Sequence, residues 1–479
     1  MSQEWITTFV YLAGLLGASF FVLGLHQMNS PATARGGNRL SASGMTIAVV
    51  ATLIGLITRP EGLGASAWVI IVVGFAIGGG AGLYAARTVK MTAMPQLVSL
   101  FNAVGGGAAA LVAISDFIRL SSTGADLSTT IFVVLGAVIG SITFSGSLIA
   151  GGKLQGLIPG KPIQVPGGRI VTIVIALVAA AGTIALILGS AGTIAITGDT
   201  SVAILAVVVA AGLIFGITMV LPIGGADMPV VISLLNSFTG TAAAMAGFVI
   251  GNPVLIISGA LVGASGGILT KLMADAMNRS VLNIIAGGFG GGEGVTAVVG
   301  AGGGTVREIS ADDAAIQLAY AQSVIVVPGY GLAVAQAQHQ VRELAELLES
   351  RGVDVKYAIH PVAGRMPGHM NVLLAEANVP YPQLKEMEEI NPEFDRCDVA
   401  LVVGANDVTN PAARKPGSPV SGMPILDVDH AKSIIVIKRS MGRGYAGIDN
   451  ELYTDPKTGM LFADAKDGLQ ALVTAVKAV

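Results

Sequence analysis

The stretch SVIVVPGYGLAV, residues 323–334, decides the fold of the C-terminal part of this chain. The β-branched run 323–327 predicts a buried strand. After the glycine turn at 328–331, we expect a helix that continues to about Arg351 and a second strand from Val353 to Ile359. Strand, glycine turn, helix and strand form the βαβ unit of a doubly wound sheet. We therefore predict a soluble α/β Rossmann-like domain with a parallel sheet.

The turn itself has the pattern Gly329-x-Gly331-x-x-Val334, a dinucleotide-binding turn whose last glycine is replaced. Glycines at the first two positions let the backbone approach a pyrophosphate, which then lies at the N-terminus of the helix. The pattern by itself is weak evidence, but its place between a strand and a helix strengthens it. We therefore predict that this domain binds a dinucleotide.

The residue after the second predicted strand is His360, where NAD-binding folds usually carry an acid that binds the ribose 2′-hydroxyl. Its absence favours a nucleotide with a 2′-phosphate, and a basic partner is then expected. Lys438-Arg439-Ser440 directly follows the predicted strand 434–437 and supplies two cations and a hydroxyl. On these residues alone, a solvated strand end explains the same three residues equally well.

Two more glycine-rich or polar turns follow predicted strands. The first is Val362-Ala363-Gly364-Arg365-Met366-Pro367-Gly368, and the second is Gly404-Ala405-Asn406-Asp407. In open α/β sheets, ligands bind at the carboxyl ends of the strands. Both turns are therefore candidate parts of the nucleotide site.

The rest of the chain has a different composition. The protein has 479 residues, of which 53% are hydrophobic and only 12% are charged, and its mean hydropathy is +0.74. Ordinary globular domains have roughly 25% charged residues. The charges are concentrated after residue 270 or so, which indicates a domain boundary. We predict a membrane domain at 1–285, a glycine-rich linker at 286–304 and the dinucleotide-binding domain at 305–479.

The membrane domain has nine apolar segments long enough to cross the hydrocarbon core, which takes about 20 residues. The second is short and the fourth is rich in glycine. The segments are 5–25, 43–58, 66–86, 97–114, 128–150, 169–188, 201–221, 229–249 and 253–272.

The basic residues between these segments predict the orientation, because Lys and Arg accumulate on the cytoplasmic side. The first, third and fifth loops are basic. The second, fourth, sixth and eighth loops hold only Arg59 and Arg119. This pattern predicts an N-terminus outside and a C-terminal domain in the cytoplasm or matrix. The cations of the basic loops and of the segment after the last span are Arg35, Arg39, Arg87, Lys90, Lys153, Lys161, Arg169, Lys271 and Arg279.

Pairs of glycines four residues apart occur inside three spans. They are Gly74 with Gly78, Gly136 with Gly140, and Gly212 with Gly216. Small residues at this spacing let helices approach closely. A tight bundle with room for a proton rather than for a bulky solute is expected.

Three polar residues in or next to the spans are candidates for a proton path, since polar groups in a membrane are costly and usually functional. Asp227 lies in a short loop before the eighth span, where it could equally be a solvated cap of the following helix. Asn236 lies inside the eighth span and Asn102 inside the fourth, and for both the alternative is a hydrogen bond between helices. An amide does not titrate, so the asparagines alone cannot carry a proton.

Other classes of function find no support. No basic patch with interleaved aromatic residues indicates nucleic acid, and we expect no metal. The single cysteine, Cys397, indicates a buried apolar residue rather than a nucleophile. No acid–base constellation is evident, and a hydride transfer between two nicotinamides would need none, since it requires only close and oriented rings.

Taken with these features, the chain resembles the β subunit of the proton-translocating NAD(P) transhydrogenase over essentially its full length. The resemblance rests on 224–231 (GGADMPVV) with Leu235-Asn236-Ser237, on 328–331 (PGYG), on 360–376 (HPVAGRMPGHMNVLLAE), on 404–407 (GAND), and on 438–440 (KRS) with 444–447 (GYAG).

This resemblance implies that the soluble domain binds NADP(H) and meets an α subunit that carries NAD(H) and further membrane spans. Hydride then passes between the two nicotinamides, coupled to inward proton movement through the bundle. A bacterial inner membrane and a dimer of the whole complex are expected. The resemblance assigns Asp227 and Asn236 to the proton path. The residues predicted to contact NADP(H), from the motif and the resemblance together, are Gly329, Tyr330, Gly331, Val362, Ala363, Gly364, Arg365, Met366, Pro367, Gly404, Ala405, Asn406, Asp407, Val408, Gly422, Met423, Lys438, Arg439, Ser440, Met441, Gly442, Arg443, Gly444, Tyr445, Asp464 and Ala465.

There is one departure from the family pattern. Asn102 stands where some members have an intramembrane histidine that is thought to carry the proton. We therefore hypothesise that a span of the α subunit supplies the titrating group.

Two other functions are compatible with part of the sequence. A transporter or channel with a redox-sensing NADP domain predicts a substrate site of broken helices near the midplane, and nothing in the spans marks one. A membrane-anchored NADP-dependent dehydrogenase needs an acid–base residue that the sequence does not reveal.

Overall fold

The structure is a computed structural model of the chain. It describes residues 3–58, 62–90, 93–121, 126–160, 162–163, 167–196, 198–224, 227–277, 280–287, 305–364, 368–416, 418, 420–444 and 446–479. The chain divides into two compact units, one formed by 1–270 with 284–289 and the other by 271–283 with 290–479. Each unit is described by itself.

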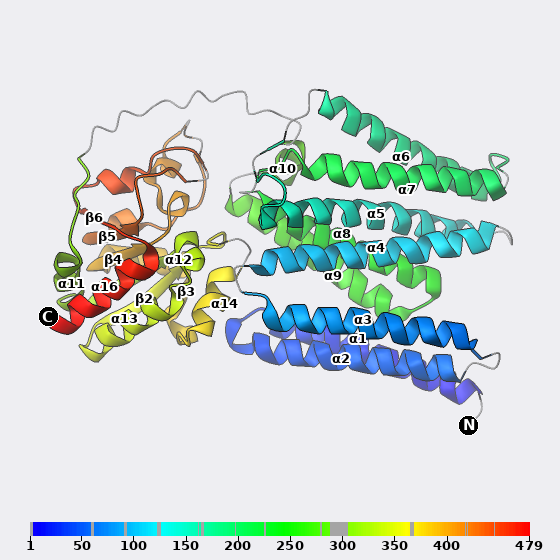
Figure 1. The fold of residues 1–479 in the computed structure, drawn as a ribbon, viewed down its shortest axis with the longest axis horizontal. Helices are drawn as coiled ribbons and strands as arrows, with labels where there is room; N and C mark the ends of the chain where they lie inside the picture. The colour runs from blue at the N-terminus through cyan, green and yellow to red at the C-terminus, as the bar shows by residue number, and fades with distance from the viewer. Residues whose placement is uncertain are drawn as a thin grey trace. The chain divides into compact units, whose positions relative to one another are not determined.

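Nine long helices in the described part of the first 277 residues are apolar enough to cross a membrane, as predicted (Figure 1). They are α1 (Gln3–Gln27), α2 (Pro31–Ile57), α3 (Ala65–Thr88), α4 (Met94–Ser121), α5 (Leu127–Gln155), α6 (Gly168–Ser190), α7 (Gly198–Val220), α8 (Met228–Ile250) and α9 (Pro253–Ala276).

The predicted span limits were too narrow, because a helix can continue past the apolar run that crosses the hydrocarbon. The largest error concerns the second span, which was expected to begin at residue 43. Helix α2 begins at Pro31, so Arg35 and Arg39 lie on a helix and not in a loop. Arg87 and Lys153 likewise lie in the last turns of α3 and α5. Among the other cations used for the orientation, Arg59, Lys161 and Arg279 lie outside the described residues.

Helix α5 is the centre of the bundle and contacts α4, α6, α7 and α8. Its glycine Gly140 packs on the backbone of α4 at Gly106, and Gly216 of α7 packs on Ile142 and Ser145 of α5. These contacts confirm the close packing predicted for two of the three glycine pairs. The expectation was wrong for Gly74 and Gly78 of α3, because a Cβ at either position would meet no described atom within 4 Å.

The C-terminal unit contains a six-stranded parallel sheet with the order β3-β2-β1-β4-β5-β6 (Figure 1). Its strands are β1 (Ser323–Pro328), β2 (Asp354–Ile359), β3 (Leu384–Glu386), β4 (Val399–Val403), β5 (Ser433–Lys438) and β6 (Thr458–Phe462). The longer helices of this unit are α11 (Ala311–Ala319), α12 (Tyr330–Ala335), α13 (Gln338–Ser350), α14 (His369–Glu376) and α16 (Ala465–Ala478), and α10 (Val281–Gly287) includes residues of both units. The predicted Rossmann-like parallel sheet is confirmed. Helix α10 includes residues 286 and 287 of the predicted linker, and 288–304 lie outside the described residues.

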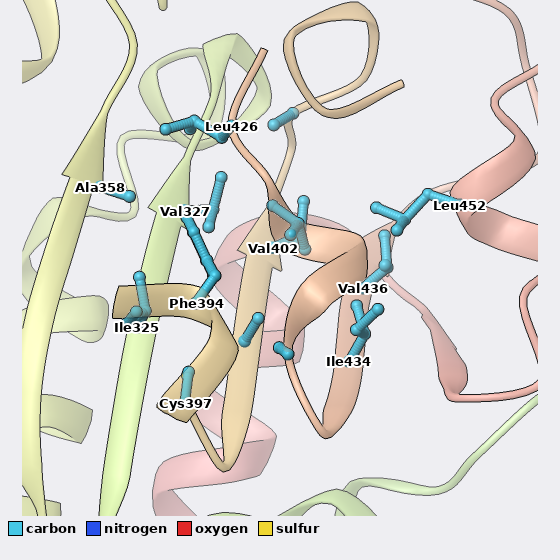
Figure 2. Close-up of a cluster of buried hydrophobic side chains, with 14 of the residues drawn as sticks. Ile325, Val327, Ala358, Phe394, Cys397, Val402, Leu426, Ile434, Val436 and Leu452 are labelled. Atoms are coloured by element: carbon cyan, nitrogen blue, oxygen red, sulfur yellow. The ribbon is translucent and has the colours of Figure 1, made fainter. Parts of the chain in front are cut away.

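Side chains of the strands are buried on both faces of this sheet, as parallel sheets require. One core cluster contains Ile325 and Val327 of β1, Val402 of β4 and Val436 of β5, and Figure 2 shows them together with Phe394. Phe394 belongs to the short helix η3 (Asn391–Arg396) and is fully buried. A side chain buried to this degree stabilises the fold by about 1.5–3 kcal/mol. On the opposite face, α16 packs against α11, α12, α13 and β5.

The helix after the glycine turn differs from its prediction. A single helix was expected from the turn to about Arg351, but the chain forms α12, breaks, and begins α13 at Gln338. The break lies at Gln336, whose φ of 52° places it in the left-handed region. The amide N–H of Ala337 donates back to Leu332, which closes α12 after one and a half turns.

Candidate functional site

The glycine turn lies at the point where the sheet order reverses, between β1 and β4. In doubly wound sheets this is the crevice that binds a ligand. The Gly329 N–H donates to Val403 O at 2.9 Å, and the Gly331 N–H donates to Gly404 O at 2.9 Å. A Cβ on Gly331 would lie 2.7 Å from the Cα of Gly404. These glycines therefore allow two backbone turns to pack on each other, a role that the nucleotide motif did not predict.

His360, at the end of β2, is turned into the protein and is 1% exposed. Its Nδ1 accepts the Val362 N–H at 3.2 Å, so its Nε2 carries the proton and donates to Pro424 O at 2.9 Å. Burial lowers the pKa of His360 to about 4, against the smaller opposing effect of the Pro424 hydrogen bond. A neutral imidazole therefore stands directly after β2, where NAD-binding folds carry an acid. It also joins the loop after β2 to the segment that contains Gly422 and Met423.

The turn after β4 and the loop after β5 come together, as the sequence predicted for parts of one site. The Asp407 Oδ2 accepts the Ala446 N–H at 3.0 Å. A Cβ on Gly444 would overlap Asp407 Oδ1, so a larger residue there would displace this carboxylate. These contacts link the predicted segments 404–408 and 438–445 directly.

The two cations after β5 have different environments. The Lys438 ammonium donates to Gly442 O and lies over the Tyr453 ring, 4.7 Å from its centroid. Burial lowers the pKa of Lys438. Arg439 is exposed, and its guanidinium makes no hydrogen bond or ion pair within the described part of the chain. Arg443 is paired with Asp449 at 3.0 Å. Arg439 is therefore the cation of this loop that is free to bind an anion.

Two residues that support this edge were missed by the sequence analysis. The Tyr453 hydroxyl donates to Ala405 O at 2.9 Å, and the Asn450 amide donates to Asn406 O at 2.9 Å. Tyr453 lies 48 residues after Ala405, and Asn450 lies 44 residues after Asn406. No local pattern announces such contacts.

The remaining candidates lie in other parts of the unit. Gly422 has a φ of 78°, and Met423 packs on a small apolar cluster that includes Val420 and Ile425. The carboxylate of Asp464 accepts the Lys466 N–H at 3.1 Å and caps α16, which begins at Ala465. Val362, Ala363 and Gly364 follow β2, and Tyr330 begins α12. Ser440 and Met441 are exposed beside Arg439. Arg365, Met366, Pro367 and Tyr445 lie outside the described residues.

In the membrane unit, Asp227 occupies the N-cap position of α8, but its side chain makes no capping hydrogen bond to that helix. Asn236 lies nine residues further along α8, about 13 Å by the rise of an α-helix. The Asn102 amide of α4 is 4% exposed and donates to Ile232 O of α8 at 3.4 Å. In an α-helix, this carbonyl also accepts the N–H of Asn236. Asn102 and Asn236 are therefore joined through one carbonyl at the contact between α4 and α8.

The described residues contain no group of three or more His, Cys, Asp or Glu side chains that could hold a metal ion. Cys397 is buried, and burial raises the pKa of its thiol to about 11. A protonated, buried thiol is unreactive, which agrees with the structural role expected for this residue.

Comparison with known proteins identifies the family. The sequence model described as "NAD(P) transhydrogenase beta subunit" matches residues 10–475. Two proteins of Rhodospirillum rubrum, both named "NAD(P) transhydrogenase subunit beta", are each 49% identical over 472 residues, which cover 97% of this chain and 98% of theirs. The resemblance noted in the sequence motifs is confirmed. The chain therefore belongs to the NAD(P) transhydrogenase β subunit family, as a membrane-bound oxidoreductase subunit that acts on nicotinamide nucleotides together with an α subunit.

Proposed function

We propose that residues 305–479 bind NADP(H) and that hydride passes between this nucleotide and NAD(H) on the α subunit, coupled to proton movement through residues 1–285. The observation that carries the proposal is the carboxyl edge of the sheet. There, a neutral His360 follows β2 in place of the acid of NAD-binding folds, and the free cation Arg439 follows β5, three strands along the sheet. This combination favours a nucleotide with a 2′-phosphate.

The residues at this edge fit such a ligand. Backbone N–H groups of residues 405–408 are the proposed donors for phosphate oxygens, since the Gly329, Gly331 and Gly404 N–H groups already donate within the sheet edge. Arg439 provides a planar, charged donor set for the 2′-phosphate. Lys438 shapes the same loop through its bond to Gly442 O. The full set of proposed contacts remains the one predicted from the sequence.

When bound, the two nicotinamides supply hydride donor and acceptor in the reaction NADH + NADP⁺ → NAD⁺ + NADPH, which balances without a proton from the protein. The chain therefore needs no general base at the reacting carbons. Its part is to hold and orient one nucleotide so that the two rings meet.

The proton path is proposed to include Asp227, Asn236 and Asn102. Asp227 is the titratable group of the three, and the amides of Asn102 and Asn236 position water or neighbouring groups. The bond from the Asn102 amide to Ile232 O places Asn102 against α8, the helix that carries Asn236, which supports including both in the path. Because neither amide titrates, the second titrating group is proposed to lie in a span of the α subunit.

For location, we propose a bacterial inner membrane, with the N-terminus outside and the C-terminal domain in the cytoplasm, and a dimer of the complete complex. The basic residues at alternate ends of the spans support this orientation. Nucleic acid and metal ions have no part in the proposal.

The test uses the complex purified with its α subunit and reconstituted in lipid vesicles. Hydride transfer from NADH to an NADP analogue is followed with and without a proton gradient. We expect transfer whose rate depends on the gradient. Gradient-insensitive transfer contradicts the coupling, and no transfer at all contradicts the enzymatic function and favours a redox sensor.

A second experiment addresses the titrating group. Every intramembrane histidine of the α subunit is replaced, and proton uptake is measured during turnover. Loss of uptake is expected. If pumping continues at the full rate, the titrating group does not lie on an α-subunit histidine.

A further inference from the structure

A buried lysine in the membrane unit has no part in the function proposed so far. Lys153 lies in the last turns of α5 and is 5% exposed. Its ammonium donates to Ile223 O at 2.8 Å and also to Leu221 O. Taking an ammonium out of water is costly unless it is paired and hydrogen-bonded. The position of these two acceptors therefore explains why this lysine is kept inside the protein.

Both acceptors follow the C-terminus of α7, which ends at Val220. The carbonyls at the end of a helix lack intrahelical donors, and the helix dipole makes this end negative. No carboxylate forms an ion pair with Lys153 within the part of the chain that the structure describes. The backbone at the end of α7 therefore takes the place of a counter-ion.

The same short segment leads directly to Asp227. Leu221 O also accepts the Ile163 N–H at 3.1 Å, so the segment is held from two sides. The Asp227 N–H then donates to Gly224 O at 3.1 Å, and α8 begins at Met228. Only three residues separate Ile223 from Asp227. Lys153 is thus the side chain by which α5, the central helix, holds the connection between α7 and the N-terminus of α8.

We propose that Lys153 is a positioning residue of the proton path. Its ammonium fixes the segment Leu221–Gly224, and through it the place of Asp227 and the first turn of α8. The inference rests on the proposed role of Asp227. Lys153 itself transfers no proton and touches no substrate.

The test compares Lys153→Met, which keeps the length of the side chain and removes its charge and donors, with Lys153→Arg, which keeps both. The control is Lys271→Met, since Lys271 also stands near the end of an apolar helix but is 71% exposed and paired with Asp275. Each variant is purified with its α subunit and reconstituted. Proton uptake, turnover and the KM for NADPH are measured.

We expect Lys153→Met to lower proton uptake and kcat about tenfold, because Ile223 O loses its donor and Leu221 O keeps only the Ile163 N–H, while the KM for NADPH stays within about twofold. Lys153→Arg retains half or more of the wild-type uptake, and Lys271→Met matches the wild type. Wild-type uptake in Lys153→Met overturns the inference. So does a Lys153→Arg complex as slow as Lys153→Met, because a positioning charge is rescued by its conservative replacement. If Lys153→Met does not assemble, Lys153→Gln is scored by the same criteria.

Asp227→Asn is measured alongside, to test the proposed proton path separately from the positioning role of Lys153. If Asp227→Asn pumps normally, the proposed proton path is wrong whatever Lys153 does. If Asp227→Asn loses uptake and the Lys153 variants keep it, the path stands and only the positioning role of Lys153 is wrong.

Discussion

Replacing His360 with asparagine tests the neutral histidine at the candidate nucleotide edge. The asparagine Oδ1 can take the place of Nδ1 and still accept the Val362 N–H, but the donor to Pro424 O is lost. Pro424 is exposed, so its carbonyl can turn to water, and the loss of this hydrogen bond costs about 0.5–1.5 kcal/mol. We therefore expect the loop after β2 to open more readily in His360→Asn at pH 7.5.

The pH dependence of this effect follows from the pKa of the ring, which burial lowers from 6.5 to about 4. Above pH 6.5 the ring is neutral in both states, and its stabilising contribution is complete. As the pH falls from 6.5 to about 4, the unfolded chain binds a proton that the folded chain does not bind, so the contribution is lost. Over this interval of roughly 2.5 pH units, the loss is about 3 kcal/mol at ~1.4 kcal/mol per unit.

Hydrogen–deuterium exchange of the complex, corrected for the intrinsic rate at each pH, measures the free energy of opening of the peptide that contains Val362. Between pH 6.5 and 4.5, the free energy of opening should fall with decreasing pH in the wild type more steeply than in His360→Asn. The difference in slope should correspond to the uptake of about one proton on opening. His430→Asn is the control, because His430 is half exposed at the surface and should leave this peptide unchanged. Parallel pH profiles for the wild type and His360→Asn would refute a ring that is kept neutral by burial.

Three further predictions concern other parts of the molecule. Arg439→Ala should weaken NADPH binding about tenfold or more, the loss of a charge-assisted hydrogen bond, as measured by titration calorimetry. Gly331→Ala should destabilise the C-terminal unit by about 1–3 kcal/mol, because its Cβ would lie 2.7 Å from the Cα of Gly404; exchange protection of β1 and β4 reports this. For the orientation, an impermeant maleimide should label Ser66→Cys in intact cells, and should label Thr88→Cys only after the membrane is opened.

Each of these has its own control. Equal loss of NADH and NADPH affinity in Arg439→Ala would assign that residue to something other than the 2′-phosphate. Gly442→Ala is exposed at the same edge and meets only Ser440 Oγ at 3.4 Å, so it should be tolerated where Gly331→Ala is not. The native Cys397 gives little background, since it is buried with a pKa of about 11. Reversed labelling would invert the proposed orientation.

Much of the fold could be predicted because its signals are local. The apolar runs predicted nine membrane helices, and the β-branched run before a glycine turn predicted a parallel sheet. Both patterns depend only on neighbouring residues, and both predictions are confirmed. The helix limits were less accurate, because hydropathy marks where a helix is apolar and not where its hydrogen bonds end. The break at Gln336 was missed, since no proline or glycine marks it.

The sequence by itself thus determined the membrane bundle, the parallel sheet and the segments that meet at its carboxyl edge. Only the tertiary structure decided which side chains are free to act there. Lys438 and Arg439 are adjacent and look equivalent, yet Lys438 is held by Gly442 and Tyr453 while Arg439 is free within the described residues. Lys153 looked like a loop cation, and its acceptors lie 68 and 70 residues away. Periodicity is set by the nearest few residues, whereas the partner of a side chain depends on which distant segments packing brings beside it.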